Sequence, residues 1–250
     1  MLNSETKSWR GLALLSIACG VLHAAPGSNA SDLPQWKLVW SDEFEAEGLP
    51  DPEKWAYDVG GHGWGNRELQ FYTEDRPENA RVENGSLIIE ARKEAFEGSD
   101  YTSARLVTRG RENWTYGRFE IRARLPDCRG TWPAVWMLPV DWNLGSGKWP
   151  DIGEIDIMEH VGYDVGTVHA SAHSKKYQWQ IGTQKTATVS VPDATEAFHV
   201  YALEWTPDEI RAYVDGEQFF SYANEGDGWE SWPYQRDYYL ILNLAVGGAW

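Results

Sequence analysis

The sequence predicts an all-β protein, built as an antiparallel sandwich or barrel, and three features of the chain indicate this. Residues 118–125 alternate strictly between polar and apolar side chains, which is the pattern of a half-buried strand. Short apolar or alternating runs recur after residue 35, and turn-forming residues separate them. No window of more than ten residues shows helical periodicity. Because the chain has 250 residues and no internal repeat or linker after its first segment, we expect one domain.

Residues 1–30 are expected to lie outside that domain. Lys7 and Arg10 precede an apolar run at 11–22, and small residues follow it. This order is typical of a secretory signal, and the run is too short to span a bilayer. A core helix is the alternative, but it leaves the lack of polar patterning unexplained. We therefore predict that residues 31–250 form the folded domain and that the mature protein is extracellular or periplasmic.

Within the domain, the strands are predicted from the turns between them. Asn84-Gly85 is a tight-turn pair that opens the apolar run at 87–89. In the run at 118–125, the odd-numbered side chains are expected to enter the core. Three more strands are predicted towards the end of the chain, at 199–205, 209–214 and 218–222. Pro207-Asp208 and Asp215-Gly216 supply the turns between these three strands.

The composition excludes some classes of function. With 22 basic and 38 acidic side chains, the formal net charge is −16, so a nucleic-acid binder that works through a basic patch is excluded. The same charge argues against binding to anionic membrane surfaces and to strongly sulfated or uronic substrates. The chain contains 15 Trp and 12 Tyr but only 7 Phe. That excess of rings with a polar edge suggests flat faces that contact a ligand.

One segment, residues 149–162, combines three acids with large apolar residues. On a regular strand Glu154 and Asp156 share a face, because successive side chains alternate. Glu159 is an odd step from both and would point into the core, where a carboxylate is costly to desolvate. One extra residue, inserted as a β-bulge at 157–158, returns it to the same face. The sequence therefore predicts a bulged strand with three acids in a row.

Such a row suits the cleavage of an acetal bond. Two carboxylates on either side of the bond can act as nucleophile and proton donor. After the bulge, the Cα atoms of Glu154 and Glu159 are about 13 Å apart, so the strand must curve for their carboxyl groups to approach each other. The charge of Asp156 between them favours a protonated neighbour. Two alternatives remain: a calcium or magnesium site, and three acids on a solvated face, which the apolar residues between them disfavour.

Several other side chains are candidates for contacts with the same ligand. His169 and His173 lie on one face of the next predicted strand. Trp132 and Trp136 also share a strand face, and Trp149 lies in the loop that enters the acid strand. An indole ring can stack on the C–H face of a sugar without leaving hydroxyl groups unpaired. The alternatives are a structural histidine and ordinary core packing of the indoles.

The segment Gly153-Glu154-Ile155-Asp156-Ile157-Met158-Glu159 resembles the active-site signature of glycoside hydrolase family 16, specifically its bacterial laminarinase-like β-1,3-glucanases. Five further segments are similar to parts of that family, at 40–44, 63–73, 116–120, 130–139 and 243–248. The resemblance extends from about residue 35 to residue 250.

The resemblance implies a jelly-roll sandwich with a cleft on its concave sheet and a reaction that retains the anomeric configuration. It implies that Glu154 is the nucleophile, Asp156 its modulating partner and Glu159 the general acid and base. It also implies that Asn66, in a glycine-rich loop, and Arg105 contact the sugar, and that the two histidines face the cleft. Ala104 stands where the family more often has Gly.

The function that follows is a secreted, monomeric, retaining endo-β-1,3-glucanase that acts on laminarin and needs no metal for catalysis. The alternatives are a mixed β-1,3/1,4-glucanase, a hydrolase of a neutral galactan such as agar, and a non-catalytic glucan-binding module, although such modules have lost the acids. Relatives continue past Gly247-Gly248 into a final strand, whereas this sequence stops at Trp250, so we expect either a fragment or a domain without that strand. We therefore expect an exposed strand edge, and a structural calcium remains possible although its site would lack an acid from that strand.

Overall fold

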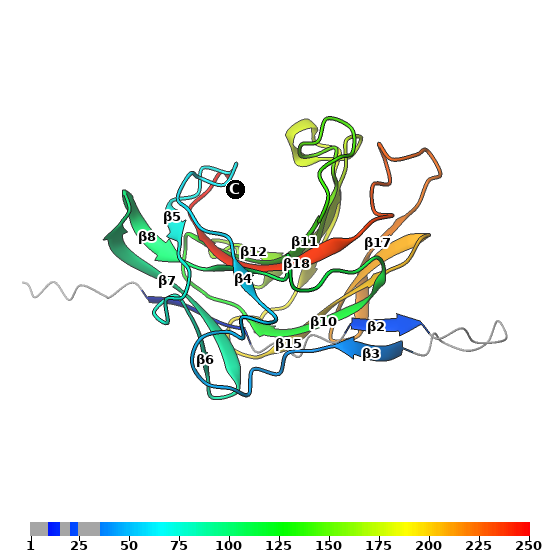
Figure 1. The fold of residues 1–250 in the computed structure, drawn as a ribbon. Helices are drawn as coiled ribbons and strands as arrows, with labels where there is room; N and C mark the ends of the chain where they lie inside the picture. The colour runs from blue at the N-terminus through cyan, green and yellow to red at the C-terminus, as the bar shows by residue number, and fades with distance from the viewer. Residues whose placement is uncertain (1–9, 16–20, 25–35) are drawn as a thin grey trace, which may run out of the picture.

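The computed structural model describes residues 10–15, 21–24 and 36–250. These residues form two β-sheets packed face to face (Figure 1), so the predicted antiparallel all-β fold is confirmed. In the described part of the chain, the one helix is the short 3₁₀ turn η1 (Trp179–Ile181). No helix among these residues is long and apolar enough to cross a membrane.

One sheet has seven strands, and every neighbouring pair in it is antiparallel. In spatial order its strands are β14 (Lys185–Ser190), β13 (Thr167–His173), β12 (Glu154–His160), β11 (Thr131–Pro139), β18 (Tyr238–Val246), β9 (Arg105–Val107) and β4 (Ala56–Tyr57). The acid strand β12 therefore lies inside this sheet, with neighbours on both sides.

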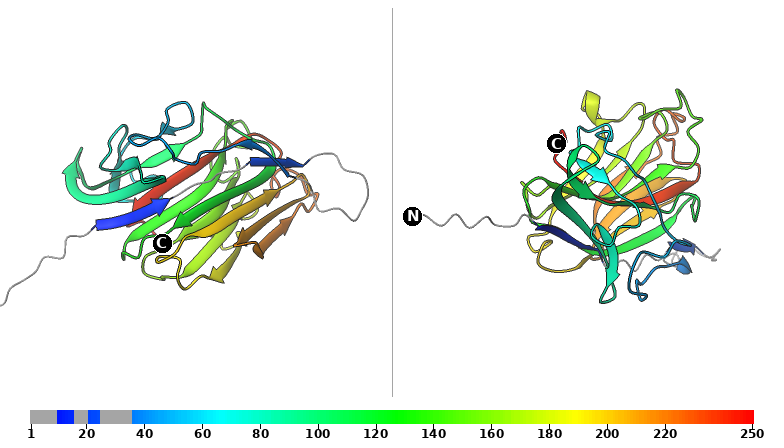
Figure 2. Two further views of the ribbon diagram at one scale, coloured as in Figure 1. Left: turned by 90° about the horizontal axis from the view of Figure 1, so that it is seen from below. Right: turned by 60° about the vertical axis from the view of Figure 1, so that its left-hand side comes forward.

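The second sheet has eleven strands in the described residues. Its main path is β17 (Glu217–Ala223), β16 (Glu209–Val214), β15 (His199–Trp205), β10 (Gly117–Arg124), β1 (Arg10–Leu15), β7 (Ser86–Phe96), β8 (Ser99–Ser103) and β5 (Gln70–Tyr72). Three strands lie off this path: β2 (Val21–Ala24), β3 (Trp36–Trp40) and β6 (Ala80–Glu83). Figure 2 shows the strands of this sheet side by side in its left-hand view.

The strands predicted from alternation and turns are present. In β10, Phe119, Ile121 and Ala123 are fully buried, whereas the residues between them are partly or fully exposed. The turn at 215–216 has the expected geometry. At Asp215-Gly216 both residues have positive φ, 50° and 85°, as a two-residue hairpin turn requires. Glycine adopts this conformation without the steric cost that a Cβ atom brings.

The hydrophobic core lies between the two sheets. The seven-stranded sheet contributes residues such as Ile155, Ile157 and Leu242, and the other sheet contributes residues such as Phe119 and Leu203, all at most 1% exposed. One face of β12 and one face of β10 are therefore committed to the core. The other face of β12 is free to carry polar groups.

The first two strands fall within the segment predicted to be a secretory signal. β1 lies between β7 and β10 and pairs with both, and β2 pairs with β10 and β3. Removal of this segment stays a prediction. The exposed strand edge expected from a missing C-terminal strand likewise stays a prediction.

The seven-stranded sheet is bowed, and loops rise at both ends of its outer face (Figure 1). At one end are the loop at 58–69 and the last residues of the chain. At the other end are the loops at 140–153 and 174–184, the latter carrying η1. The polar face of β12 lies on the bowed floor between these two groups of loops.

Candidate active site

The three acids of β12 share one face of the sheet because the strand contains a bulge. Asp156 pairs with Ser171 of β13, and Glu159 pairs with His169, so three steps on β12 match two steps on β13. The extra residue lies at 157–158, where the sequence predicted it. The predicted bulge is therefore confirmed.

The local sequence makes this geometry favourable. Ile155, Ile157 and Met158 are at most 1% exposed and pack in the core between the sheets. Removing these side chains from water stabilises the strand in the orientation that leaves the acids on the opposite face. Gly153 starts the strand with φ of 85°, and a Cβ atom there would lie 2.3 Å from the Tyr238 hydroxyl. Only glycine fits this entry to the strand without moving its neighbours.

Glu154 and Asp156 form a compact group with His173, which pairs with Glu154 across the strands. His173 Nε2 lies 3.2 Å from Asp156 Oδ2 and 3.9 Å from Glu154 Oε1. The Glu154 side chain remains 17% exposed, whereas the Asp156 side chain is only 4% exposed. Glu154 is thus the accessible member of the pair, and Asp156 lies behind it.

Glu159 has a separate set of neighbours. Trp132 Nε1 donates a hydrogen bond of 3.0 Å to its Oε1 atom, and His169 pairs with it on β13. The ring of Trp250 lies 5.3 Å from that of Trp132 and 4.8 Å from that of His169. Trp132 and His169, both predicted as ligand contacts, are therefore placed beside Glu159.

Burial raises the pKa of all three carboxyl groups. The pKa of Glu154 is well above its usual range because of burial and the charge of Asp156. Burial raises the pKa of Asp156 to about 8, against a hydrogen bond with Glu154 that lowers it. Burial and the Asp156 charge raise the pKa of Glu159 to about 8, against the nearby His173 and the Trp132 hydrogen bond. The three groups cannot all be ionised near neutral pH, so the site retains protons.

A calcium or magnesium site fits this arrangement poorly. Glu154, Asp156 and His173 each place one donor atom within 4.8 Å of the others, and no further such group occurs among the described residues. Hard cations take six or more oxygen ligands, whereas one of these three donors is an imidazole nitrogen. Glu159 is engaged by Trp132 and is not part of the group. The donor set favours acid–base chemistry over a site for a hard cation.

A chain of hydrogen bonds joins Trp136 to Asn66, two predicted ligand contacts that are far apart in sequence. Trp136 Nε1 donates to Asn243 Oδ1 at 2.7 Å, and Asn243 Nδ2 donates to the Tyr72 hydroxyl at 3.0 Å. The Tyr72 hydroxyl donates to Glu68 Oε2 at 3.2 Å, and Asn66 Nδ2 donates to Glu68 Oε1 at 3.2 Å. This chain fixes the orientation of both end residues relative to each other.

Arg105 is held between two indole rings. Its guanidinium carbon lies 4.7 Å from the ring centres of both Trp64 and Trp136, and its Nε atom lies 3.0 Å from Asp58 Oδ2. The residue is only 7% exposed. The structure thus places the predicted contact Arg105 beside two indole rings, each within the range of a cation–π interaction.

Trp149 lies at the same end of the site as Glu154. Its ring centre is 5.8 Å from that of His173 and 6.2 Å from that of Trp179. The predicted contacts Trp149 and His173 are therefore neighbours, although one comes from the loop before β12 and the other from the end of β13.

The sequence prediction missed several residues that support the site. They are Asp58, Trp64, Glu68, Tyr72 and Asn243. Four of the five lie in the two segments at 63–73 and 243–248 that resemble the family, so their importance could have been suspected. Their partners could not be read from spacing, because the contacts join distant parts of the chain.

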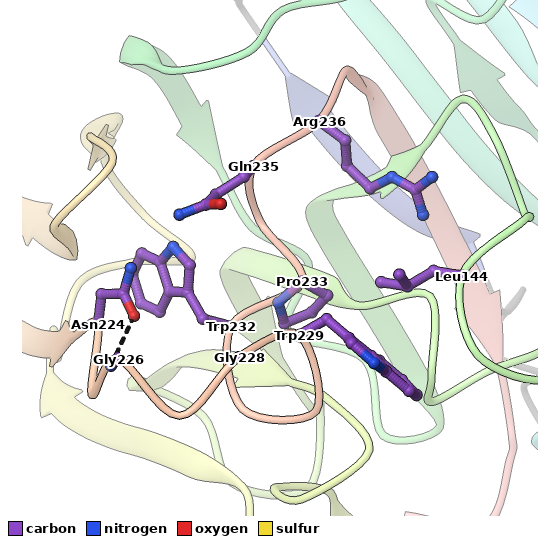
Figure 3. A pocket seen from close by; sticks show the side chains of 9 residues that line it. All are labelled: Leu144, Asn224, Gly226, Gly228, Trp229, Trp232, Pro233, Gln235 and Arg236. Carbon is purple, nitrogen blue, oxygen red and sulfur yellow. Dashed lines mark hydrogen bonds between the residues drawn. The ribbon is translucent and has the colours of Figure 1, made fainter.

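A separate pocket of about 460 Å³ lies beside this face (Figure 3). It is formed by Leu144 and by residues of the loop between β17 and β18, including Trp229, Trp232 and Arg236. None of the three acids lines it. The chemistry therefore lies on the open floor of the sheet and not in this pocket.

Comparisons with known proteins identify the family of this chain. The sequence matches the family described as glycosyl hydrolases family 16 over residues 67–250. A β-glucanase of Rhodothermus marinus is 59% identical over 240 residues, which are 94% of this chain and 82% of that protein. The X-ray structure of the laminarinase from Rhodothermus marinus superposes with a TM-score of 0.86 at 59% identity and covers 88% of this chain and 89% of that one. SCLam, a non-specific endo-β-1,3(4)-glucanase, has a TM-score of 0.81 at 42% identity, covering 93% of this chain and 87% of its own.

Proposed function

Because the chain belongs to glycoside hydrolase family 16, we propose that the three acids of β12 cleave a β-1,3-glucan by double displacement. The chain is a retaining glycoside hydrolase, and its β-glucanase and laminarinase relatives support internal cleavage of β-1,3-glucan. The observation that carries the assignment of residues is the bulge that places Glu154, Asp156 and Glu159 on one face.

In the first step, Glu154 attacks the anomeric carbon and forms a covalent bond to the sugar. The bond between that carbon and the glycosidic oxygen breaks, and Glu159 gives its proton to the leaving oxygen. The pKa of Glu159, raised by burial to about 8, keeps this proton in place at neutral pH. The fragment that leaves keeps the proton that Glu159 donated.

In the second step, Glu159 is ionised and accepts a proton from a water molecule. The resulting oxygen attacks the anomeric carbon, and the bond to Glu154 breaks. Two inversions at the same carbon restore the original configuration. Asp156 shares a hydrogen bond with Glu154, and an ionised Asp156 raises the pKa of Glu154. When Asp156 holds a proton this repulsion is absent, so Glu154 can be ionised and attack.

The proposal is tested with Glu154→Ala and with Glu217→Ala as a matched control, since Glu217 is exposed on the other sheet. We expect Glu154→Ala to lower turnover of laminarin on the order of 10⁴-fold, while polysaccharide binding persists. Glu217→Ala should hydrolyse laminarin at the rate of the unmodified protein. If Glu154→Ala retained normal turnover, Glu154 would not be the nucleophile.

A second candidate substrate is mixed β-1,3/1,4-glucan. SCLam, with 42% identity, is a non-specific endo-β-1,3(4)-glucanase, so this scaffold is compatible with both linkages. A product profile on laminarin, lichenan and agarose separates the two and also tests a neutral galactan. A protein that bound these glucans without releasing products would be a binding module instead.

We also propose that the protein is secreted and acts as a monomer. A polymeric glucan is too large to enter a cell, and the basic residues followed by an apolar run at 11–22 support export. Determining the N-terminal residue of the exported protein tests this. A start at or before Lys7 would contradict cleavage of a signal, and a dimer mass in solution would contradict the monomer.

A further inference from the structure

The turn η1 presents two large apolar side chains to solvent next to the active site. Trp179 is 47% exposed and Ile181 is 60% exposed. Local hydrogen bonds hold this turn: the Gln178 side chain accepts from Gln180 N at 2.8 Å, and Gly182 N donates to Trp179 O at 3.0 Å. The backbone is thus ordered although its apolar side chains are not buried, which is typical of a surface that contacts a ligand.

Trp179 continues a row of rings that begins at the nucleophile. The His173 ring nitrogen lies 3.9 Å from Glu154, and the His173 ring centre is 5.8 Å from that of Trp149. Trp149 in turn lies 6.2 Å from Trp179, with an angle of 39° between the ring planes. Each step is comparable to the size of a sugar ring. The row therefore leads outward from the reacting centre to the exposed indole.

This row lies on the β13 side of the acids, opposite to Arg105 and Trp136. Arg105 and Trp136 belong to β9 and β11, on one side of β12. Trp179 belongs to the loop between β13 and β14, on the opposite side. In Figure 1 this loop rises beside the loop that enters β12. A chain that is cut in its interior must have contacts on both sides of the acids.

The charges near η1 favour a neutral ligand. Lys175 and Lys176, which precede the turn, form ion pairs with Glu230 and Asp227. Their charges are therefore already compensated, and they offer little attraction to an anionic chain. An exposed indole with neutralised surroundings suits the apolar C–H face of an uncharged sugar.

We propose that Trp179 is a binding platform for a distal glucosyl unit of the β-1,3-glucan, beyond Trp149 and on the β13–β14 side of the acids. This inference rests on the proposed function, because it requires that the substrate extends in both directions from the cleaved bond. It gives the enzyme a preference for long chains, since only a long chain reaches from Glu154 to η1.

The test compares Trp179→Ala with Trp142→Ala. Trp142 is also 47% exposed, but it lies on the neighbouring loop and outside the row of rings. We would measure kcat/KM for β-1,3-linked glucose oligomers of increasing length and for laminarin. The ratio of kcat/KM for the longest to that for the shortest oligomer should fall about 3- to 10-fold in Trp179→Ala, mainly through KM. Trp142→Ala should keep the ratio of the unmodified protein, and Trp179→Phe should restore most of it.

Each of the following outcomes would overturn the inference. An unchanged length dependence in Trp179→Ala would show that the indole does not contact the chain. An equal loss for all lengths, with a lowered melting temperature, would show a structural role. A change in oligomeric state without a change in kinetics would make η1 a protein contact. If the unmodified protein failed to cleave laminarin, the proposed function would fall as well, so the two failures are distinguishable.

Discussion

The indole nitrogen of Trp132 donates a hydrogen bond of 3.0 Å to Oε1 of Glu159, across the β11–β12 pair. This bond stabilises the ionised carboxylate and therefore lowers the pKa of Glu159, whereas burial and the charge of Asp156 raise it. The pKa of about 8 is the balance of these opposing effects. Substitutions of the residues around Glu159 can therefore raise or lower its pKa.

Replacing Trp132 with Phe removes the donor and keeps an aromatic ring. The ionised form of Glu159 then loses a hydrogen bond, so its pKa should rise, by about one unit. Because Glu159 must be protonated to release the leaving group, the alkaline limb of kcat/KM against pH should move to higher pH. The control is Trp142→Phe, an exposed indole away from the acids. A limb that stayed in place, or moved to lower pH, would contradict the role of this bond.

Asp156→Asn should shift the same limb in the opposite direction. The charge of Asp156 raises the pKa of Glu159 and of Glu154, so its removal should lower both. The alkaline limb of kcat/KM should therefore move to lower pH, and kcat should fall because the amide of Asn cannot exchange a proton with Glu154. The pH profile of the variant on laminarin measures both effects. An alkaline limb at higher pH than in the unmodified protein would refute this assignment.

Two substitutions at Arg105 separate the effect of its charge from the effect of its flat guanidinium group. Its positive charge lowers the pKa of Glu154 and of Glu68. In Arg105→Met the charge is lost, so the acid limb of kcat/KM should move to higher pH, because Glu154 must be ionised to attack. In Arg105→Lys the charge stays but the flat stacking between two indoles is lost, which should cost about 1 kcal/mol of stability. If the acid limb of kcat/KM lay at the same pH in both variants, the charge of Arg105 would not act on Glu154.

His160 should make the fold sensitive to acid. It is fully buried, its Nε2 accepts from Gly166 N at 3.2 Å, and its Nδ1 has no partner. Burial lowers its pKa from 6.5 to about 4. Its folded pKa is below the unfolded value, so stability is complete above pH 6.5 and is lost as the pH falls towards 4. The loss should reach about 3 kcal/mol.

Denaturant unfolding at pH 7.5 and pH 4.5 measures this loss. His160→Gln keeps an acceptor for Gly166 N but cannot be protonated in this range. The variant should therefore lose less free energy of unfolding between the two pH values than the unmodified protein. A difference that is the same in both proteins would assign the acid sensitivity to other groups.

The acid row was predictable because its causes are local. The alternation of a strand fixes which side chains share a face, and a buried Glu159 without the bulge would be costly, so the sequence itself requires the extra residue. The strands 199–205 and 209–214 were predictable for the same reason, since alternation and turn residues lie within a few positions of each other.

The supporting contacts could not be predicted in this way. Asn243 and Tyr72 meet only because the end of β18 lies beside residues 68–72, which include β5. The sugar contact of Arg105 stays a prediction, and its neighbours Trp64, Trp136 and Asp58 come from other parts of the chain. Such contacts depend on the spatial order of strands, which a local pattern does not contain.

The position of β1 has a practical consequence for anyone who produces this protein. Among the described residues, β7 and β10 are bridged by Arg10–Leu15 and do not pair with each other. Protein that begins after Ala30, which is also the form expected after signal cleavage, should therefore expose the facing edges of β7 and β10 to solvent and to any extended peptide. Preparations with and without residues 1–30 should be tested for aggregation before their melting temperatures or activities are compared.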